Sequence, residues 1–466
     1  MESKNFDVVV LGGGPGGYPA AIRAAQLGKS VALIEAKELG GTCLNRGCIP
    51  SKTLIAGGEF VGRLKDAAKF GIDISATSID FSRLAHHKDL IVKKMRSGLE
   101  RLIAMNKISV FRGYGKLVSP HEIKVIGEDS ALITGEKIII ATGSEPRNFS
   151  SFPFDYERIH DSTSLLALTT LPKKILIIGG GVIGCEFASL YAHLGVDVTI
   201  LELLPRIIST EAQEMSRELT RVFLKRGIKV ETDVKVQKIE RTHLGIEAFA
   251  DGGRSFIADC CLVAVGRSLN TKGIGLDKAG VMVEDNGLIT VNDKMETSVD
   301  GIYAVGDIAS KWWLAHVASH QGIIAAENAC GKQVRMFYNA IPSVIFTDPE
   351  IGSVGLSLEE AIKQGYRAKL GAFPFQALGK SQATLQTEGF GQIVVDEKTG
   401  QILGAQVMGY EAATLIAQMT LAITHELTVE CIAETIHAHP TISEVWGEAA
   451  MLAEGFPLHL PLGSVK

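Results

Sequence analysis

The sequence has little cysteine, no long apolar run and no large excess of charge of one sign. Its seven cysteines in 466 residues are few and odd in number, so a framework of stapling disulfides is not expected. No uncharged apolar stretch reaches the roughly 18 residues that cross a bilayer, and the first residues lack the charged-then-apolar layout of a signal peptide. The 47 basic and 52 acidic residues give a net charge of −5. We therefore expect a cytoplasmic protein with no nucleic-acid partner and no membrane insertion.

Glycine, by contrast, is abundant, with 50 residues, and it builds two copies of one pattern. The copies run from Asp7 to Glu35 and from Lys174 to Glu202. Each has an apolar run, a Gly-x-Gly-x-x-Gly turn, a helix-like stretch and a second apolar run that ends in glutamate. The turn glycines are Gly12, Gly14 and Gly17 in the first copy and Gly179, Gly181 and Gly184 in the second. One such turn is a weak signal, but two copies at equal spacing indicate two βαβ nucleotide-binding units.

These turns have the chemistry that a dinucleotide requires. The glycines allow a tight strand-to-helix turn, bring backbone N–H groups close to the pyrophosphate and let the helix pack on the strand. Glu35 and Glu202 lie where a carboxylate accepts hydrogen bonds from ribose hydroxyls. Because a carboxylate repels a 2′-phosphate, Glu202 predicts that the second unit prefers NAD over NADP.

The rest of the chain divides by pattern. Each copy is followed by a strand that ends in small residues, at Ala141-Thr142-Gly143 and at Gly266. A later strand, 301–305, runs into Asp307, which suggests that the chain returns to complete the first unit. From about Pro342 the pattern changes to strands with turns and then helices. That pattern predicts a third, α+β unit containing a hairpin at 392–408.

Two cysteines stand close together just after the first copy. Cys43 and Cys48 cannot bridge on a regular helix, because residues five apart rise about 7.5 Å and point away from each other. We therefore expect irregular backbone at Gly47, with a helix starting near Pro50 and Cys48 at its N-terminus. That position, with Lys52 one turn later, favours a thiolate. The alternatives are two ordinary reduced thiols or half of a metal site, and no second Cys/His cluster completes a metal site, so no metal is predicted.

Near the C-terminus, His439 and Glu444 allow two interpretations. The run from Thr441 to Glu444 fits a capping box, in which the glutamate reaches back to a backbone N–H, and His439 before a proline fits a turn. Alternatively, histidine with a carboxylate that fixes its tautomer is a base suited to thiols near neutral pH.

The chain resembles the flavin-dependent pyridine nucleotide disulfide oxidoreductases, and most closely their lipoamide branch. The resemblance covers essentially the whole chain and is carried by both glycine turns, the run 41–52, Ala141-Thr142-Gly143, the run 303–307 and the run 437–444. It implies an α/β fold of two Rossmann-like FAD/NAD(P)-binding domains plus a C-terminal α+β dimerisation domain. The implied ranges are 1–149 and 275–341 for FAD binding, 150–274 for NAD binding and 342–466 for dimerisation. It also implies an FAD site formed by Gly12, Gly14, Gly17, Glu35, Gly143 and Asp307, and an NAD site formed by Gly181, Gly184, Glu202 and Gly266.

The resemblance further implies the reaction. Protein-bound dihydrolipoyl groups would be oxidised and NAD⁺ reduced through FAD and a Cys43–Cys48 redox disulfide, with a Lys52–Glu186 pair beside the flavin. His439, preferred over His437, would act with Glu444 on the disulfide of the other subunit, so a homodimer is expected. The expected partner is a lipoyl-bearing acyltransferase of a 2-oxo acid dehydrogenase complex or a glycine-cleavage carrier protein. Alternatives are a glutathione-type or mercuric reductase, or a noncatalytic flavoprotein redox sensor.

Overall fold

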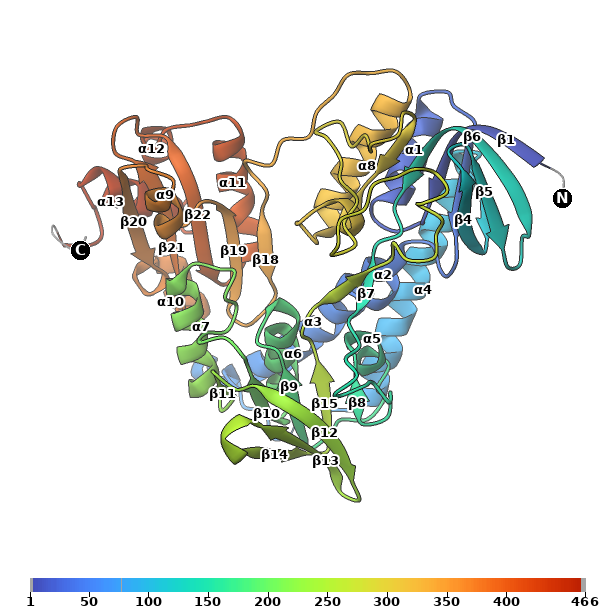
Figure 1. Cartoon of the computed structure of the whole chain (residues 1–466). Coiled ribbons are helices and arrows are strands. Elements are labelled where there is room, and N and C mark those ends of the chain that lie inside the picture. Colours follow the sequence, from blue (N-terminus) through green and yellow to red (C-terminus); the bar gives the residue numbers. More distant parts are fainter. Residues whose placement is uncertain (1–2, 77, 462–466) are drawn as a thin grey trace.

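The computed structural model describes residues 3–76 and 78–461. Figure 1 shows three units: one that contains the N-terminus, a second below it and a C-terminal unit on the opposite side. Helix α3 (Cys48–Leu64) packs against α6 (Val182–His193) of the second unit. The segment that holds Cys43 and Cys48 therefore lies where the first two units meet.

The first unit is built on a seven-stranded sheet. Its strands follow the order β3-β2-β1-β6-β5-β4, and β17 pairs with the end of β6. The residues Val8, Val9 and Val10 are almost fully buried, as expected for a parallel strand covered on both faces. The strands are β1 (Ser3–Leu11), β2 (Val31–Glu35), β3 (Ser109–Arg112), β4 (Tyr114–Ser119), β5 (Glu122–Ile126), β6 (Ala131–Ile140) and β17 (Ile302–Ala304). Its helices are α1 (Gly17–Gln26), α2 (Gly41–Arg46), α4 (Phe81–Met105) and α8 (Ala315–Ala329), with short 3-10 turns at η1 (Ala67–Phe70) and η3 (Gly306–Ala309).

The second unit has a five-stranded parallel sheet in the order β11-β10-β9-β15-β8. A three-stranded antiparallel sheet, β12-β13-β14, lies beside it, and β7 pairs with β16. Strand β7 (Ser144–Pro146) lies in the segment that leads from the first unit to the second. The strands of the second unit are β8 (Ile159–His160), β9 (Lys174–Ile178), β10 (Asp197–Leu201), β11 (Lys229–Glu231), β12 (Val236–Thr242), β13 (Gly245–Ala250), β14 (Ser255–Ala258), β15 (Cys260–Val263) and β16 (Arg267–Leu269). The other helices are α5 (Ser162–Leu166), α7 (Gln213–Lys225) and the turn η2 (Asp251–Gly253).

The C-terminal unit is an antiparallel sheet in the order β18-β19-β22-β21-β20, with α11 and α13 packed on it. The predicted hairpin is confirmed, because β21 pairs antiparallel with β22. The strands are β18 (Ser343–Ile345), β19 (Glu350–Gly355), β20 (Ala368–Pro374), β21 (Phe390–Asp396) and β22 (Ile402–Gly409). The helices are α9 (Leu358–Lys363), α10 (Gly379–Thr384), α11 (Ala412–Thr424), α12 (Val429–Ala433) and α13 (Glu444–Glu454), with the turn η4 (Phe375–Ala377).

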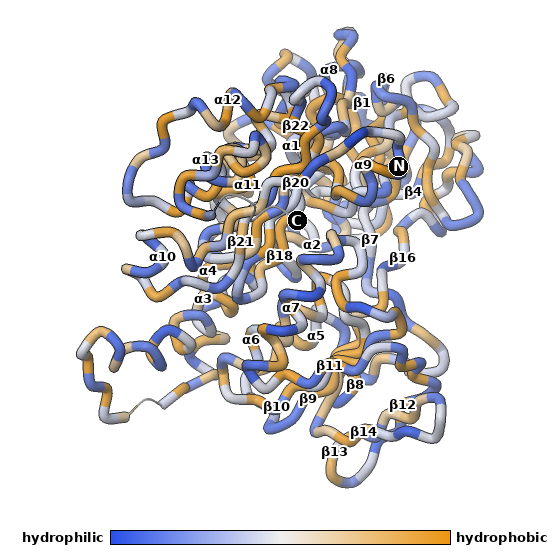
Figure 2. The backbone as a smooth tube through the Cα atoms, turned by 90° about the vertical axis from the view of Figure 1, so that its left-hand side faces the viewer, coloured by the Kyte–Doolittle hydropathy of each residue, from blue (hydrophilic) through white to orange (hydrophobic). Residues whose placement is uncertain are grey.

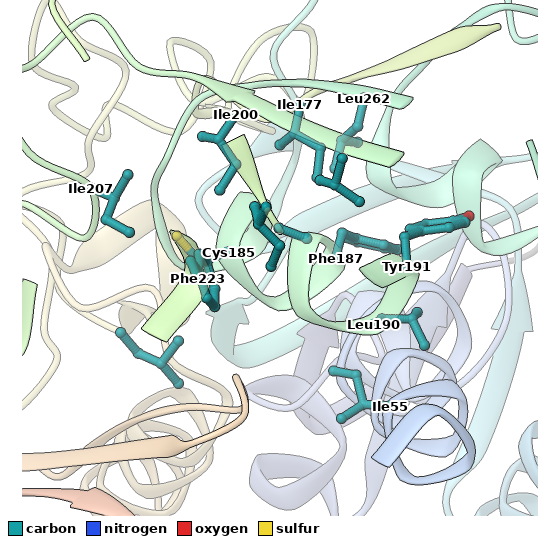
Figure 3. Packing of buried hydrophobic residues seen from close by; sticks show 14 of the residues in the cluster. Ile55, Ile177, Cys185, Phe187, Leu190, Tyr191, Ile200, Ile207, Phe223 and Leu262 are labelled. Carbon is teal, nitrogen blue, oxygen red and sulfur yellow. The ribbon is translucent and has the colours of Figure 1, made fainter. Parts of the chain in front are cut away.

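Each unit has its own apolar core. Figure 2 shows hydrophobic stretches along many of the strands and hydrophilic stretches in many outer loops. In the core of the second unit, Leu190 of α6 lies beside Ile55 of α3 (Figure 3), so that core extends onto the cysteine-bearing helix. Within the described residues, no helix is both long enough and apolar enough to span a membrane. Because β17 returns to β6 after the second unit, we keep the discontinuous ranges 1–149, 150–274, 275–341 and 342–466 as a proposal for the domains.

Candidate functional site

The first glycine turn joins β1 to α1. Gly12 has a φ of +107°, and a β-carbon there would lie 2.3 Å from the carbonyl oxygen of Ala141. A β-carbon on Gly17 would lie 1.7 Å from the carbonyl oxygen of Gly12. At Gly14, by contrast, a β-carbon would meet only the α-carbon of Gly41, at 3.7 Å. Backbone space therefore stays open at the N-terminus of α1, where the pyrophosphate of a dinucleotide fits.

The second turn, between β9 and α6, repeats this geometry. Gly179 has a φ of +105°, and a β-carbon there would lie 2.5 Å from the carbonyl oxygen of Ala264. A β-carbon on Gly184 would lie 2.0 Å from the oxygen of Gly179, whereas Gly181 has no atom within 4 Å of that position. The residues present therefore fit a dinucleotide in each unit.

Glu35 and Glu202 hold their glycine turns in the same way. The N–H of Gly13 donates to Oε2 of Glu35 at 2.7 Å, and the N–H of Gly180 donates to Oε2 of Glu202 at 2.5 Å. Each Oε1 accepts a second backbone N–H from two residues further on, at 2.7 Å in both copies. The carboxylates are thus fixed at the turns and keep lone pairs for ribose hydroxyls.

Asp307 belongs to a polar chain that sequence reasoning missed. The Ser144 hydroxyl donates to Oδ2 of Asp307 at 2.5 Å, and Nε of Arg267 donates to that hydroxyl at 2.7 Å. Burial lowers the pKa of Arg267, against the attraction of Asp307. A signal was present, because Ser144 and Arg267 directly follow Gly143 and Gly266, the small residues that end the equivalent strands. Both glycines have positive φ and open space around a built β-carbon.

The backbone between the two cysteines is irregular, as expected. Helix α2 ends at Arg46, Gly47 has φ −141° and ψ −111°, and α3 begins at Cys48. A β-carbon on Gly47 would lie 3.0 Å from the carbonyl oxygen of Thr42, so a side chain there would be crowded. Cys43 and Cys48 are both free thiols in this structure, and Cys48 lies in the first turn of α3.

The two thiols differ in acidity. A hydrogen bond between them raises the pKa of Cys43 and lowers the pKa of Cys48 to about 7. Burial raises the pKa of both thiols, and the positive charge of Lys52 lowers both. Cys48 is therefore the more acidic thiol of the pair, and Cys43 is the hydrogen-bond donor.

The expected Lys52–Glu186 ion pair forms. Nζ of Lys52 lies 2.7 Å and 2.9 Å from the two carboxylate oxygens of Glu186, which comes from α6 and is only 6% exposed. The N–H of Phe346 donates to the same carboxylate at 3.0 Å, and Nζ of Lys52 lies 4.6 Å from the centre of the Phe346 ring. Nothing in the sequence indicated Phe346, because this contact joins residues from three units.

In the C-terminal unit, Glu444 makes one contact from each of the two interpretations. Its Oε1 lies 2.8 Å from Nδ1 of His439, and its Oε2 accepts the N–H of Thr441 at 2.9 Å. Helix α13 begins at Glu444 itself, without a side-chain cap, so the predicted capping box is only half formed. Burial raises the pKa of Glu444, but the hydrogen bonds from His439 and Thr441 bring it below its usual value.

The His439–Glu444 pair does not meet the cysteines within one chain. Helix α13 packs on β20, β21 and α12, at the far side of the C-terminal unit from α2 (Figure 1). His439 is exposed and its Nε2 has no hydrogen-bond partner among the described residues. His437, by contrast, is held through both ring nitrogens, by Thr435 and Gln418. His439 is thus the histidine free to act on something outside the chain.

Two Rossmann-like units and a paired, asymmetric dithiol between them define a class of protein, the pyridine-nucleotide-linked disulfide oxidoreductases. Residues 6–322 match the family model described as pyridine nucleotide-disulphide oxidoreductase, and residues 341–450 match its dimerisation domain. The chain belongs to this family.

Curated relatives and a solved structure are similar to this chain over nearly its whole length. The chain is 53% identical to the dihydrolipoyl dehydrogenase of Chlamydia pneumoniae and 43% identical to that of Thermus scotoductus; each alignment covers 98% of this chain and 99% of the relative. It also superposes on LpdA from Mycobacterium tuberculosis with a TM-score of 0.91 and 28% identity, over 97% of this chain and 99% of that one.

These comparisons confirm the predicted fold class, the family, the FAD and NAD cofactors and the oxidoreductase activity. The shared name of the relatives agrees with the predicted dihydrolipoyl substrate. The match to a dimerisation domain supports the predicted homodimer.

Proposed function

We propose that this chain oxidises protein-bound dihydrolipoyl groups to lipoyl groups and reduces NAD⁺, with Cys43, Cys48, His439 and Glu444 as its catalytic residues. The observation that carries the proposal is the placement of the two thiols: Cys48 begins α3 directly after the break at Gly47, and Lys52, ion-paired to Glu186, lies one turn later. Within this pair Cys48 is the more acidic thiol. Such a pair lets one thiol exchange with substrate while the other becomes the stable thiolate.

The exchange step follows from these acidities. His439 takes the proton of one substrate thiol, and the resulting thiolate attacks the sulfur of Cys43 in the oxidised enzyme, which breaks the Cys43–Cys48 bond. The second substrate sulfur then displaces Cys43, closes the substrate disulfide and leaves its proton on Cys43. The enzyme disulfide is now reduced: Cys43 is a thiol and Cys48 a thiolate, and together they hold the electron pair from the substrate. Bound FAD and NAD⁺ would supply the acceptor chemistry that carries this pair onward as a hydride.

The other predicted site residues would hold the cofactors. Gly12, Gly14, Gly17, Glu35, Gly143 and Asp307 would hold FAD, and Gly181, Gly184, Glu202 and Gly266 would hold NAD. Lys52, fixed by Glu186, would keep a positive charge beside Cys48. Arg206 supports NAD over NADP, since its guanidinium donates to the backbone oxygens of Glu211 and Ser209 and is not free for a 2′-phosphate.

His439 would act on Cys43 of the partner subunit. The supporting observations are its exposure, its free Nε2 and its distance from the cysteines of its own chain. The substrate arm would belong to an acyltransferase of a 2-oxo acid dehydrogenase complex or to a glycine-cleavage carrier protein, in the cytoplasm, and we propose neither a nucleic-acid nor a membrane partner and no metal.

Subunit complementation tests this arrangement. Cys43→Ser and His439→Gln homodimers are each expected to lose NAD⁺ reduction by dihydrolipoamide, the latter by about 10²–10⁴-fold. Co-expressed variants should recover roughly a quarter of wild-type activity, because half of the random dimers are mixed and each mixed dimer holds one intact composite site. His437→Gln is the matched control and should stay active. No recovery in isolated mixed dimers would refute the shared site, and activity with glutathione and NADPH in place of dihydrolipoamide and NAD⁺ would refute the substrate.

A further inference from the structure

Helix α13 carries a second carboxylate, Glu448, one turn after Glu444. Residues four apart on a helix lie on the same face, separated by about 6 Å along the axis. Oε1 of Glu448 lies 2.6 Å from Nδ1 of His459, and the side chain of Glu448 is 8% exposed. Its Oε2 is buried and has no hydrogen-bond partner among the described residues. Two imidazole–carboxylate pairs therefore share one face of α13.

The local fold brings His459 back to this helix. Gly455 ends α13 with a φ of +86°, which lets the chain reverse direction, and Leu460 packs against the core of the C-terminal unit. The imidazole itself stays 70% exposed. Since burial does not fix the ring, its contact with Glu448 is what holds it in place.

The pair also has an electrostatic reason to exist. A carboxylate as buried as that of Glu448 keeps its charge only beside a donor or a cation. The imidazole of His459 lies 2.6 Å from this carboxylate, and a histidine in that position can supply both the donor and the balancing positive charge. Its charge also reaches the neighbouring pair: together with the hydrogen bonds from His439 and Thr441, it lowers the pKa of Glu444 against the opposing effect of burial.

No other charged group around α13 is ion-paired to Glu448 in the described chain. The side of α13 toward β21 is apolar where Val445 packs on Gly391. On the remaining sides the groups are Lys369 of β20, paired with Glu454 at 3.3 Å, exposed Glu430 of α12, and His437, which packs against Gly447. In the described chain, none of these forms an ion pair with Glu448. His459 is thus the cation that balances this carboxylate.

We propose that Glu448 and His459 are a positioning pair for the acid–base dyad: His459 neutralises Glu448 and thereby sets the pH range in which His439 accepts a thiol proton. This inference rests on the proposed function, because it assigns a role beside His439. Neither residue of the pair touches the substrate.

The test is the pH profile of kcat/KM for dihydrolipoamide in the holoenzyme. His459→Gln keeps a hydrogen-bond donor for Glu448 but removes the positive charge. The uncompensated carboxylate then favours protonated His439, so the acidic limb should move to higher pH by up to about half a unit, the shift expected for a unit charge one helical turn away in a water-like dielectric. The rate on the plateau should stay near that of the wild type.

Three further variants separate charge from structure. His459→Lys restores a cation, and the double variant Glu448→Gln/His459→Gln removes both charges, so each should return the limb toward the wild-type position. Lys369→Gln removes the other cation that is ion-paired on α13, beside Glu454. Because Glu454 lies about 15 Å along the helix from Glu444, beyond the screening length, this variant should not move the limb.

The outcomes distinguish the two proposals. An unchanged limb in His459→Gln, an equal shift in Lys369→Gln, or no recovery in His459→Lys and the double variant overturns the positioning role. If instead the wild type fails to reduce NAD⁺ with dihydrolipoamide, or His439→Gln is fully active, the proposed function itself fails. Melting temperatures measured alongside identify any variant that does not fold, and the profile of His459→Lys then decides.

Discussion

Replacing Lys52 by methionine isolates the charge that favours the Cys48 thiolate. Lys52 lies one turn after Cys48 on α3 and is held 2.7 Å from the Glu186 carboxylate. The pKa of Cys48 is lowered to about 7 first by its hydrogen bond with Cys43 and then by Lys52, against burial. Methionine keeps most of the apolar stem and removes the charge together with the two hydrogen bonds that Nζ donates to Glu186.

The expected size of the effect follows from the spacing. A unit charge about 6 Å away at an effective dielectric constant of about 20 contributes about 2.8 kcal/mol, or about two pH units. Glu186 also raises the pKa of Cys48, but it is present in both proteins and does not reduce this difference. The Lys52 side chain is 30% exposed, so solvent screens part of its charge. We therefore expect the thiolate midpoint of the Lys52→Met variant to rise by about one unit. Glu186→Gln should lower the midpoint, since it removes the opposing charge.

The midpoint is measured by titrating the ultraviolet absorbance of the thiolate across pH, on the protein kept anaerobic and in its dithiol form. The absorbance of a Cys48→Ser variant at each pH is subtracted. Lys69→Met is the control, because Lys69 forms an exposed ion pair with Asp66 outside the site. An unchanged midpoint in Lys52→Met, or shifts of the same sign in Lys52→Met and Glu186→Gln, would refute this electrostatic account of Cys48.

Two further predictions concern the scaffold. Gly17→Ala places a β-carbon 1.7 Å from a backbone oxygen. We therefore expect this variant to lose at least about 2 kcal/mol of unfolding free energy and to lose bound flavin. The control is Gly98→Ala, where no atom lies within 4 Å of the new β-carbon; it should be neutral or stabilising by up to about 1 kcal/mol, and equal melting temperatures for the two variants would contradict the clash. Asp348 lies 2.8 Å from Arg226 and 3.0 Å from His193, and these partners lower its pKa below 3.8 although burial opposes them. Its stabilisation is therefore complete above the unfolded value and lost as the pH falls through the lower folded value. Asp348→Asn should cost about 1–2 kcal/mol in urea unfolding at pH 7, since a third of the side chain is exposed, and the difference should shrink near pH 3; an equal difference at both pH values would be inconsistent with this linkage.

The features that the sequence predicted well are those set by local backbone geometry. The two turns repeat because a β-carbon on Gly17 or Gly184 would lie within 2.0 Å of a carbonyl oxygen, so each position requires glycine. The break at Gly47 was likewise predictable, because two cysteines five residues apart cannot meet on a continuous helix. Such constraints act within a few residues, so they are visible in a motif.

The features that it did not predict depend on contacts between distant segments. Phe346 reaches Glu186, and Asp348 reaches Arg226, only because the C-terminal unit packs against the second unit. Their spacing in the sequence carries no periodicity that predicts such contacts. The two interpretations of Glu444 also could not be separated from sequence, since the carboxylate has two oxygens and uses one for each role.

Helix α3 connects the thiol pair to the second nucleotide-binding unit. Its first residue is Cys48, its second turn carries Lys52, and its later glycines lie against α6: a β-carbon on Gly58 would be 3.0 Å from Leu190, and one on Gly62 would be 3.0 Å from His193. Larger residues would push α3 away from α6 and pull Lys52 from Glu186. The thiol pair and the second nucleotide turn are therefore held at a fixed separation by direct helix packing. A fixed separation suits a reaction in which thiols and pyridine nucleotide exchange one electron pair in turn without ever meeting.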